Sequence, residues 1–196
     1  MSFKTTKLKN PSTLTFGMLF RCELKIPKER VAVLIGKKGM VKKEIEENTK
    51  TKIKIDTDCN IFITGEDGLA LYIAKEVIRA IGRGFNPDIA FLLLKPDYAF
   101  ELINLKDFAG KSKKALIRLK GRVIGKDGKS RKTIEELTQC YISVYGKTVG
   151  VIGASEQALM ARKAIEALLR GSPHSSVYRW LERKRRKLRV EKWISP

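Results

Sequence analysis

A Gly-x-x-Gly motif occurs twice in this chain, first at Gly36–Gly39 and again at Gly125–Gly128. An apolar pair precedes each copy, and a charged stretch of helix-forming residues follows it. Each motif predicts a sharp turn, because glycine adopts positive φ without steric cost. The glycines leave no Cβ atoms on the outside of the turn, so a sugar-phosphate backbone can lie against the main chain there. The N-terminus of the next helix also attracts anions. The motif therefore predicts a loop that holds a phosphate backbone.

The two copies match well beyond the glycines. At an offset of 89 residues the aligned pairs are Ile35 and Ile124, Ile45 and Ile134, Glu46-Glu47 and Glu135-Glu136, Thr49 and Thr138, and Ile53 and Ile142. Later matches, Ala74 with Ala161 and Gly84 with Gly171, are 87 residues apart. A repeat of this length indicates a duplicated domain and not the short unit of a solenoid.

The charge of the chain is strongly unbalanced. It contains 41 Lys or Arg and 21 Asp or Glu residues, which gives a formal net charge of +20. Such an excess predicts a polyanionic partner, more often nucleic acid than an anionic membrane. No segment approaches the ~18 apolar residues of a membrane span, and residues 1–7 lack the apolar core of a signal peptide. We therefore expect a cytosolic protein, with cytoplasmic localisation.

The residues that usually carry metal or catalytic chemistry are sparse. Cys22, Cys59 and Cys140 are isolated, so neither a disulfide framework nor a zinc site is expected. The only histidine, His174, lies in a segment with Ser and Pro, and we expect it in a solvated loop. The stretch from Gly125 to Ser130 ends in Gly-Lys-Ser but lacks the first glycine of a Walker phosphate loop. We expect no metal site, no cofactor and no catalysis.

Periodicity and turn residues divide the chain into five segments. These are a flexible basic arm at 1–15, a first module at 16–84, an apolar connector at 85–97, a second module at 98–171 and a basic C-terminal helix within 172–196. The first module is expected to contain a strand at 16–26, helices at 28–35 and 40–48, strands at 52–56 and 60–64, and a helix at 67–83. The second is expected to contain a strand at 98–105, helices at 113–124 and 130–139, strands at 141–145 and 148–152, and a helix at 156–169.

The C-terminal segment 172–196 contains eight Lys or Arg and two Glu residues, interleaved with aromatic and aliphatic side chains. The pattern predicts a helix at about 177–190 that Ser175 or Ser176 would cap. Two interpretations remain open for it. The helix packs its aromatic residues on the second module and leaves a solvated basic face, or its cations contact RNA phosphates directly.

The order of elements resembles the type I KH domain, because two strands and one helix follow the paired helices. The resemblance implies an α+β fold of two tandem βααββα modules. KH domains grip about four single-stranded nucleotides, with the Gly-x-x-Gly loop on the backbone and the bases in an adjacent groove. Carried over residue by residue, the groove would use Ile35, Ile45 and Ile53 or their neighbours in the first module and Ile124, Ile134 and Ile142 or their neighbours in the second.

The candidate RNA-binding residues are the two loops and the side chains around them. In the first module they are Ile35, Gly36, Lys37, Lys38, Gly39, Lys42 and Lys43. In the second they are Lys120, Arg122, Ile124, Gly125, Lys126, Asp127, Gly128, Lys129, Arg131 and Lys132. Asp127 repels phosphate, yet the cations around it keep the local field positive. Because the second module has more cations near its loop, we expect it to dominate RNA binding.

The whole architecture resembles a more specific family. Two type I modules, the apolar connector, the run from Leu119 to Lys129, Thr133-Ile134-Glu135 and the basic C-terminal helix look like the Partner of Nob One family in its archaeal form. The resemblance covers the chain from about Phe20 to its end. It implies a non-catalytic protein that binds single-stranded RNA, at the 3′ end region of small-subunit ribosomal RNA, and assists small-subunit maturation. The partners it implies are an rRNA maturation endonuclease, a dimethyladenosine methyltransferase or a translation initiation factor.

Other functions share parts of this pattern. A KH subunit of another RNA machine, such as the exosome or a transcription-elongation complex, would have the same motif, although no stretch is left for the S1-type barrel of an exosome cap. Membrane binding by the C-terminal helix is disfavoured, because Arg179, Lys184 and Lys187 narrow any apolar face.

Overall fold

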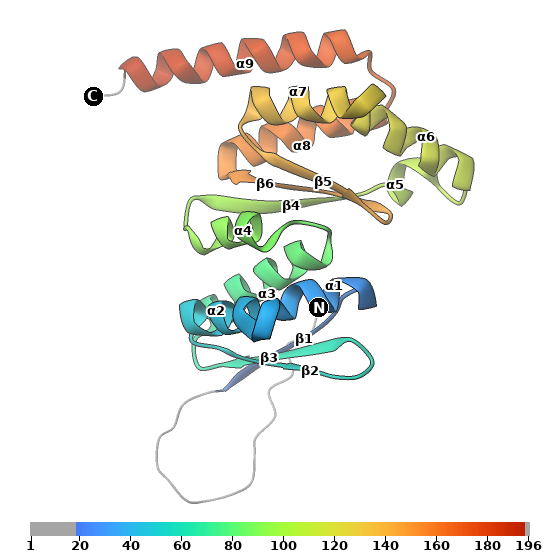
Figure 1. Ribbon diagram of the computed structural model, residues 1–196. Helices are drawn as coiled ribbons and strands as arrows, with labels where there is room; N and C mark the ends of the chain where they lie inside the picture. Colours follow the sequence, from blue (N-terminus) through green and yellow to red (C-terminus); the bar gives the residue numbers. More distant parts are fainter. Residues whose placement is uncertain (1–18, 195–196) are drawn as a thin grey trace, which may run out of the picture. The chain divides into compact units, whose positions relative to one another are not determined.

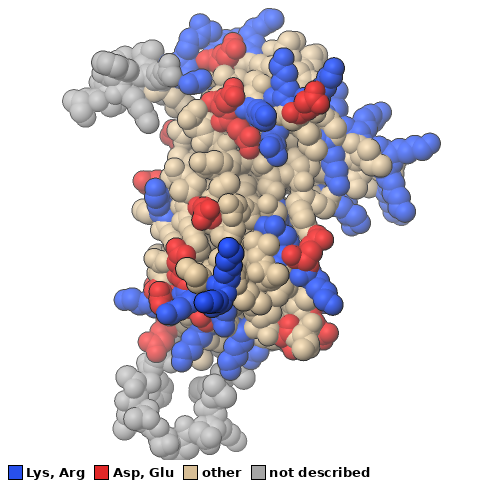
Figure 2. All heavy atoms as spheres, viewed as in Figure 1, with Lys and Arg blue, Asp and Glu red and all other residues tan. Residues whose placement is uncertain are grey.

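The computed structural model describes residues 19–194 and, in the last helix, side chains as far as Leu188. The basic arm expected at 1–15 lies outside the described residues. The chain divides into two compact units between Leu94 and Lys95 (Figure 1), and each unit is described here by itself. Lys and Arg side chains are spread over both units on the face that Figure 2 shows.

The first unit contains a three-stranded antiparallel sheet and helices that cover one face of it (Figure 1). Its elements are β1 (Phe20–Lys25), α1 (Lys28–Ile35), the 3-10 turn η1 (Lys37–Gly39), α2 (Met40–Thr49), β2 (Lys52–Ile55), β3 (Asn60–Gly65), α3 (Gly68–Gly82), α4 (Pro87–Ala90) and η2 (Phe91–Leu94). The strand order is β1-β3-β2. The apolar connector begins as α4 and η2, which pack against α3.

The second unit repeats this order with additions. Its elements are β4 (Tyr98–Asn104), α5 (Lys106–Ala109), α6 (Lys113–Ile124), η3 (Lys126–Gly128), α7 (Lys129–Thr138), β5 (Tyr141–Tyr145), β6 (Thr148–Ala154), α8 (Ser155–Leu169) and α9 (His174–Ile194). The strand order β4-β6-β5 reproduces that of the first unit. The register agrees as well, since Ile53 pairs with Ile63 and Ile142 pairs with Val151. The expected fold of two tandem βααββα modules is confirmed.

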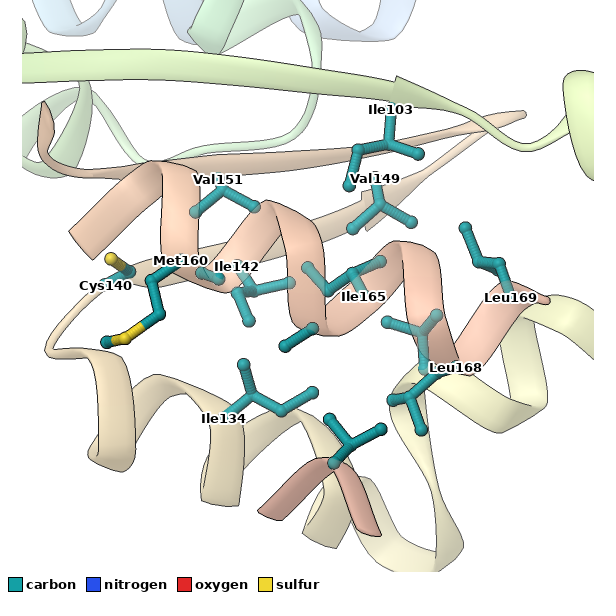
Figure 3. Close-up of a cluster of buried hydrophobic side chains, with 14 of the residues drawn as sticks. Ile103, Ile134, Cys140, Ile142, Val149, Val151, Met160, Ile165, Leu168 and Leu169 are labelled. Carbon is teal, nitrogen blue, oxygen red and sulfur yellow. The ribbon is translucent and has the colours of Figure 1, made fainter. Parts of the chain in front are cut away.

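Each unit has its own core between the helices and one sheet face. In the second unit, Ile134 of α7 points toward Ile165 and Leu168 of α8, and Val149 approaches from the sheet (Figure 3). All four side chains are fully buried. Burying each contributes about 1.5–3 kcal/mol relative to exposure. This core fixes α7, and therefore the end of the Gly-x-x-Gly loop that precedes it.

The structure corrects two expectations near the second unit's edges. The C-terminal helix begins at His174, three residues earlier than expected, and neither Ser175 nor Ser176 caps it. His174 is therefore not in a solvated loop: its Nε2 lies 2.9 Å from the backbone oxygen of Arg122, and its ring lies 6.0 Å from that of Tyr178. The short helix α5 was not expected at all. The other elements agree with the expected ranges to within a few residues.

Within the described residues, none of the helices is both long enough and apolar enough to cross a membrane. In the same part of the chain, no group of three or more His, Cys, Asp or Glu side chains is placed to hold a metal ion.

Candidate nucleic-acid interface

The two Gly-x-x-Gly loops have the same backbone conformation. Gly36 has φ 71° and ψ 179°, and Gly125 has φ 73° and ψ 177°. The second glycines agree as closely, with φ 78° and ψ 11° at Gly39 and φ 75° and ψ 8° at Gly128. All four lie at positive φ, which explains why glycine stands at each position. The repeat in the sequence is thus a repeat of one loop structure.

A third residue in each loop is left-handed without being glycine. Lys38 has φ 52° and ψ 26°, and Asp127 has φ 53° and ψ 28°. For a residue with a Cβ atom this conformation costs on the order of 1 kcal/mol. Asp is enriched in the left-handed region whereas Lys is not. The two loops therefore carry the same backbone strain with different side chains.

The first glycine of each loop is needed for internal packing. A Cβ atom on Gly36 would lie 2.5 Å from Cγ2 of Val41. A Cβ atom on Gly125 would lie 2.7 Å from both Cβ and the backbone nitrogen of Ser130. Contacts this short force a shift of the loop or the helix. The first glycine thus lets the loop close onto the first turn of its own helix.

The second glycine of each loop has the opposite environment. No atom lies within 4 Å of a Cβ built on Gly39 or on Gly128. The helices α2 and α7 begin at the next residues, Met40 and Lys129. The missing side chain therefore leaves open space beside a helix N-terminus, where backbone N–H groups attract a phosphate.

The isoleucines of the expected groove divide into two groups. Ile35 and Ile124, which precede the loops, are 38% and 36% exposed. The other four are core residues, because Ile45 and Ile134 are fully buried and Ile53 and Ile142 are 2% and 4% exposed. The groove assignment is therefore corrected. Of these six isoleucines, the one before each loop presents an apolar surface to a ligand, and the other four support the helices from inside.

The cations near the loops also divide into two groups. Among the described residues, Lys37, Lys38, Lys120, Lys126, Lys129 and Lys132 show no ion pair. Lys42 pairs with Glu46 at 3.9 Å, and its counterpart Arg131 pairs with Glu135 at 3.6 Å. Lys43 pairs with Glu47 at 3.6 Å. Lys43 is exposed, whereas Lys42 and Arg131 are half-buried. Ion pairs between residues i and i+4 of a helix are weak, so the exposed Lys43 remains available to a phosphate. The four lysines of the second unit's group outnumber the two of the first.

Arg122 has a structural role that the sequence did not predict, and its expected contact with RNA stays a prediction. Its Nε donates to the backbone oxygen of Leu168 at 3.0 Å, and its Nη2 donates to that of Ser172 at 2.7 Å. Both acceptors lie at the end of α8 or just beyond it, where helix carbonyls lack intrahelical partners. The guanidinium thus ties α6 to the end of α8. Nothing in its sequence context distinguishes a carbonyl acceptor from a phosphate.

Sequence reasoning also missed a hydrogen bond that occurs at the same position in both units. Glu46 accepts a hydrogen bond from the backbone nitrogen of Ile53 at 2.7 Å, and Glu135 accepts one from that of Ile142 at 2.7 Å. These glutamates were identified from the sequence only as aligned positions of the repeat. The alignment of Glu46 with Glu135 in the repeat was the signal that could have revealed this shared role. Each one fixes the helix after the loop to the edge strand of its sheet.

The basic helix α9 packs along α7 (Figure 1). Val177 and Leu181 are buried in the second unit's core, and Tyr178 and Trp180 pack partly against it. The helix therefore packs on the second unit, with aliphatic residues instead of the expected aromatic ones as its main anchors, and contact of its cations with RNA stays a prediction. Arg179, Arg183, Lys184 and Arg186 are exposed on the other side. This placement adds cations to the unit that carries the second loop.

Comparisons with known proteins agree with this geometry. The family described as "Eukaryotic type KH-domain (KH-domain type I)", the second KH domain of PNO1, matches residues 99–186, and the KH domain family matches residues 21–80. A KH domain-containing protein of Methanocaldococcus jannaschii is 50% identical over 177 residues, which cover 87% of this chain and 78% of the relative. The chain belongs to the Partner of Nob One family, in its archaeal form.

Relatives of the family include a solved complex. The structure described as an a/eIF2alpha-aDim2p-rRNA complex from Pyrococcus horikoshii contains a chain that is 50% identical, with a TM-score of 0.79, and the match covers 86% of this chain and 96% of that one. The pre-rRNA-processing protein PNO1 of Saccharomyces cerevisiae is 32% identical over 139 residues, which cover 70% of this chain and 50% of the relative. The chain thus spans about half the length of that eukaryotic relative.

Proposed function

We propose that this chain binds single-stranded RNA through its Gly-x-x-Gly loops and acts, without catalysis of its own, in ribosomal RNA processing. The observation that carries the proposal is the open second glycine of each loop. Gly39 and Gly128 leave free space beside a helix N-terminus. An exposed isoleucine precedes each loop, and the lysines near it include several that form no ion pair with the described part of the chain. Backbone, apolar and cationic surfaces that meet in this way are what a KH domain uses to hold RNA.

The target we propose is the 3′ end region of small-subunit ribosomal RNA, during maturation of the small subunit. Support comes from relatives: the Pyrococcus horikoshii chain described above was solved with rRNA and with the initiation factor subunit a/eIF2alpha, and the fungal relatives are named for pre-rRNA processing. Partners of the proposed role are a translation initiation factor, an rRNA maturation endonuclease and a dimethyladenosine methyltransferase.

Within this function, we assign the larger share of RNA affinity to the second unit. Four lysines within or close in sequence to its loop form no ion pair with the described residues, and α9 adds further exposed cations to the same unit. Each phosphate contact contributes on the order of 1 kcal/mol and weakens with salt. Several such contacts outweigh the repulsion from the single carboxylate of Asp127.

A titration with single-stranded and duplex RNA of equal length tests the proposal. The single strand should bind more tightly at physiological salt, because exposed isoleucines and backbone can contact splayed bases but not the interior of an A-form helix. Its affinity should fall steeply as salt is raised. Equal affinity for both RNAs would contradict the KH mode of binding and would indicate a general electrostatic attraction.

A further inference from the structure

One face of α6 carries features that do not help the protein to fold. Ile117, Gly121 and Ile124 are spaced by four and three residues, so they lie on the same side of the helix. Ile117 is 70% exposed, and no atom lies within 4 Å of a Cβ built on Gly121. An exposed isoleucine gains nothing from burial, and a glycine inside a helix lowers its stability relative to alanine. Together they form a bare apolar strip that starts at the Gly-x-x-Gly loop.

Two lysines extend this face at its far end. Lys113 and Lys114 occupy the first turn of α6 and are exposed, and that turn contains no acidic residue. Cations at a helix N-terminus oppose the helix dipole, and stability alone would favour Asp or Glu there. The Ser112 side chain caps the helix by accepting from the nitrogen of Ala115 at 3.2 Å. The helix start is thus properly capped, yet Lys113 and Lys114 in its first turn carry the charge that is unfavourable for helix stability.

The first unit lacks this extension. Its helix α1 begins at Lys28, which aligns with Ile117 at the offset of 89 residues. In the second unit α5 and the first turn of α6 are inserted before that point, and the insertion includes Lys106 and Lys111 as further exposed cations. Lys and Arg side chains project from the part of the second unit that Figure 1 labels α5 and α6 (Figure 2). The insertion thus adds charge and apolar surface to one end of the candidate interface.

We propose that this face of α6 is a second RNA subsite, which holds the single strand beyond the nucleotides in the KH groove. Ile117 contacts a base, and Lys113 and Lys114 contact phosphates. The proposal rests on the proposed function, because the subsite continues the surface that begins at Ile124 and the loop. Ile117 lies about 10 Å from Ile124 along the helix axis, at 1.5 Å per residue. It therefore lies about two helical turns from the Gly-x-x-Gly loop, at the position that aligns with Lys28, where α1 of the first unit begins.

Charge and continuity favour single-stranded RNA as the occupant. Lys113 and Lys114 lie one turn before Ile117, which stays 70% exposed, so a chain with alternating phosphates and flat bases can contact both kinds of side chain. A duplex would place its phosphates on the lysines but would leave Ile117 without a base face to contact. The two occupants therefore differ in whether the isoleucine contributes to affinity.

RNA length separates the subsite from the groove. The full chain is titrated with single strands of about four and about eight nucleotides. Ile117→Ala should weaken binding of the longer RNA by about fivefold and leave binding of the shorter one unchanged. The double variant Lys113→Ala/Lys114→Ala should reduce the slope of log affinity against log salt by about 1.4 for the longer RNA, which corresponds to two lost phosphate contacts.

The control variants are chosen from the same unit. Leu159→Ala removes an apolar side chain of α8 that is 46% exposed, and it should change neither affinity. Gly128→Asp should weaken both RNAs, because it acts at the loop. The lysine variants should also be at least as resistant to urea as the wild-type protein, since they remove cations from a helix N-terminus.

Each of the following results would overturn the subsite. If Ile117→Ala binds the longer RNA as tightly as the wild-type protein does, Ile117 does not contact a base. If Ile117→Ala loses the same affinity for both RNA lengths, Ile117 lies in the groove itself. If the α6 variants weaken only the binding of a duplex of the same sequence, the surface binds double-stranded RNA. If the wild-type protein binds neither single strand, the proposed function fails together with the subsite. If Gly128→Asp weakens RNA binding and neither α6 variant does, the proposed function stands and only the subsite fails.

Discussion

The two Gly-x-x-Gly loops share a backbone but not a charge. Lys38 and Asp127 occupy the same left-handed position, with φ 52° and 53°, although one side chain attracts phosphate and the other repels it. The glycines on either side set the conformation, so the middle position can vary without changing the fold. Charge in this family of loops is therefore adjustable, whereas shape is not.

The arginines that tie each unit together show a different kind of equivalence. Arg30 donates to the backbone oxygens of Ile81 and Phe85 in the first unit. Arg122 donates to those of Leu168 and Ser172, which are the same two positions at the offset of 87 residues. The donors themselves do not align, since Arg122 aligns with Val33 and Arg30 aligns with Leu119. The backbone carbonyls at the end of α3 and of α8 need hydrogen-bond donors in both units. An arginine can supply them from either of two aligned positions that lie about one helical turn apart.

The comparison of the two loops is tested most strongly at the second glycine. Gly128→Asp places a carboxylate where the phosphate should approach, and it should weaken RNA binding roughly a hundredfold, or about 2.7 kcal/mol. Gly39→Asp should have a smaller effect, because the second unit carries most of the affinity. The measurement is a titration with one single-stranded RNA. The first glycines are unsuitable for this test, since a side chain there would collide with the helix.

Asparagine variants at the same two positions are the matched controls. Asn and Asp both tolerate the left-handed conformation, so Gly128→Asn isolates the charge from the added volume. Both variants must keep the circular dichroism of the wild-type protein. A larger loss of affinity in Gly39→Asp than in Gly128→Asp would reverse the ranking and make the first unit the main reader of RNA.

The next largest effect is expected on stability. Arg122→Ala removes two charge-assisted hydrogen bonds and leaves two carbonyls without these donors, which should lower the free energy of unfolding by about 2 kcal/mol. Arg30→Ala should cost a similar amount in the first unit. Urea unfolding measures both. Arg122→Lys is the control, because it keeps the charge but cannot reach two acceptors with a planar fork.

RNA affinity distinguishes the two roles of Arg122. If the side chain only ties α6 to α8, the folded fraction of Arg122→Ala binds RNA with an unchanged salt slope. A slope reduced by about 0.7 would show that the guanidinium also contacts a phosphate. That result would restore the role expected from the sequence.

Much of the fold was predictable because the chain repeats itself. The apolar spacing of Ile45, Ile53 and their counterparts gave the helices and strands, and the glycine pairs placed the loops between them. The short helix α5 was not predictable, because four residues are too few to show a period. It is held by Phe108 and Ala109, which pack partly against the core, and the sequence does not reveal such tertiary contacts.

The candidate site was predictable in outline and less so in detail. Glycines and lysines around the loops were found by their spacing. The distinction between Ile124 on the surface and Ile134 in the core was not, because both are apolar residues at helical intervals and tertiary packing decides which face is covered. Ile117 could have been found from its spacing to Ile124 and from the lysines that precede it. Arg122 could not, since a guanidinium suits a carbonyl as well as a phosphate.

A smaller difference between the units follows the helix after each loop. Thr51 and Cys140 occupy aligned positions, next to Gly65 and Gly153 of the central strands. Burial raises the pKa of the Cys140 thiol to about 11, and the aligned threonine does not titrate. Above pH 9 the unfolded chain loses the thiol proton while the folded chain keeps it. Folding stability should therefore fall between about pH 9 and pH 11.

The variant Cys140→Ser removes this titration. Subtracting its free energy of unfolding from that of the wild-type protein should give a difference that is constant below pH 9 and falls by roughly 1 kcal/mol by pH 10. Urea unfolding over this range measures it. A difference that stays constant to pH 11 would mean that the thiol ionises as readily in the folded chain as in the unfolded one.

The smallest predicted effect returns to the middle of the two loops. Asp127→Lys gives the second loop the charge of the first, and it should raise RNA affinity about threefold at low salt, or by less than about 1 kcal/mol. The gain is limited because lysine suits the left-handed conformation less well than aspartate and because water and salt screen exposed charges.

Lys38→Asp is the reciprocal change and should lower affinity by less than threefold, since the first unit contributes less. Asp127→Asn separates the lost negative charge from the added positive one, and it should account for about half of the gain. Both effects should vanish near 1 M salt, where screening acts within about 3 Å. If Asp127→Lys instead weakens binding at every salt concentration, the carboxylate makes a contact of its own, such as a hydrogen bond to a ribose or a base, and the second loop reads its RNA through the residue that departs from the first.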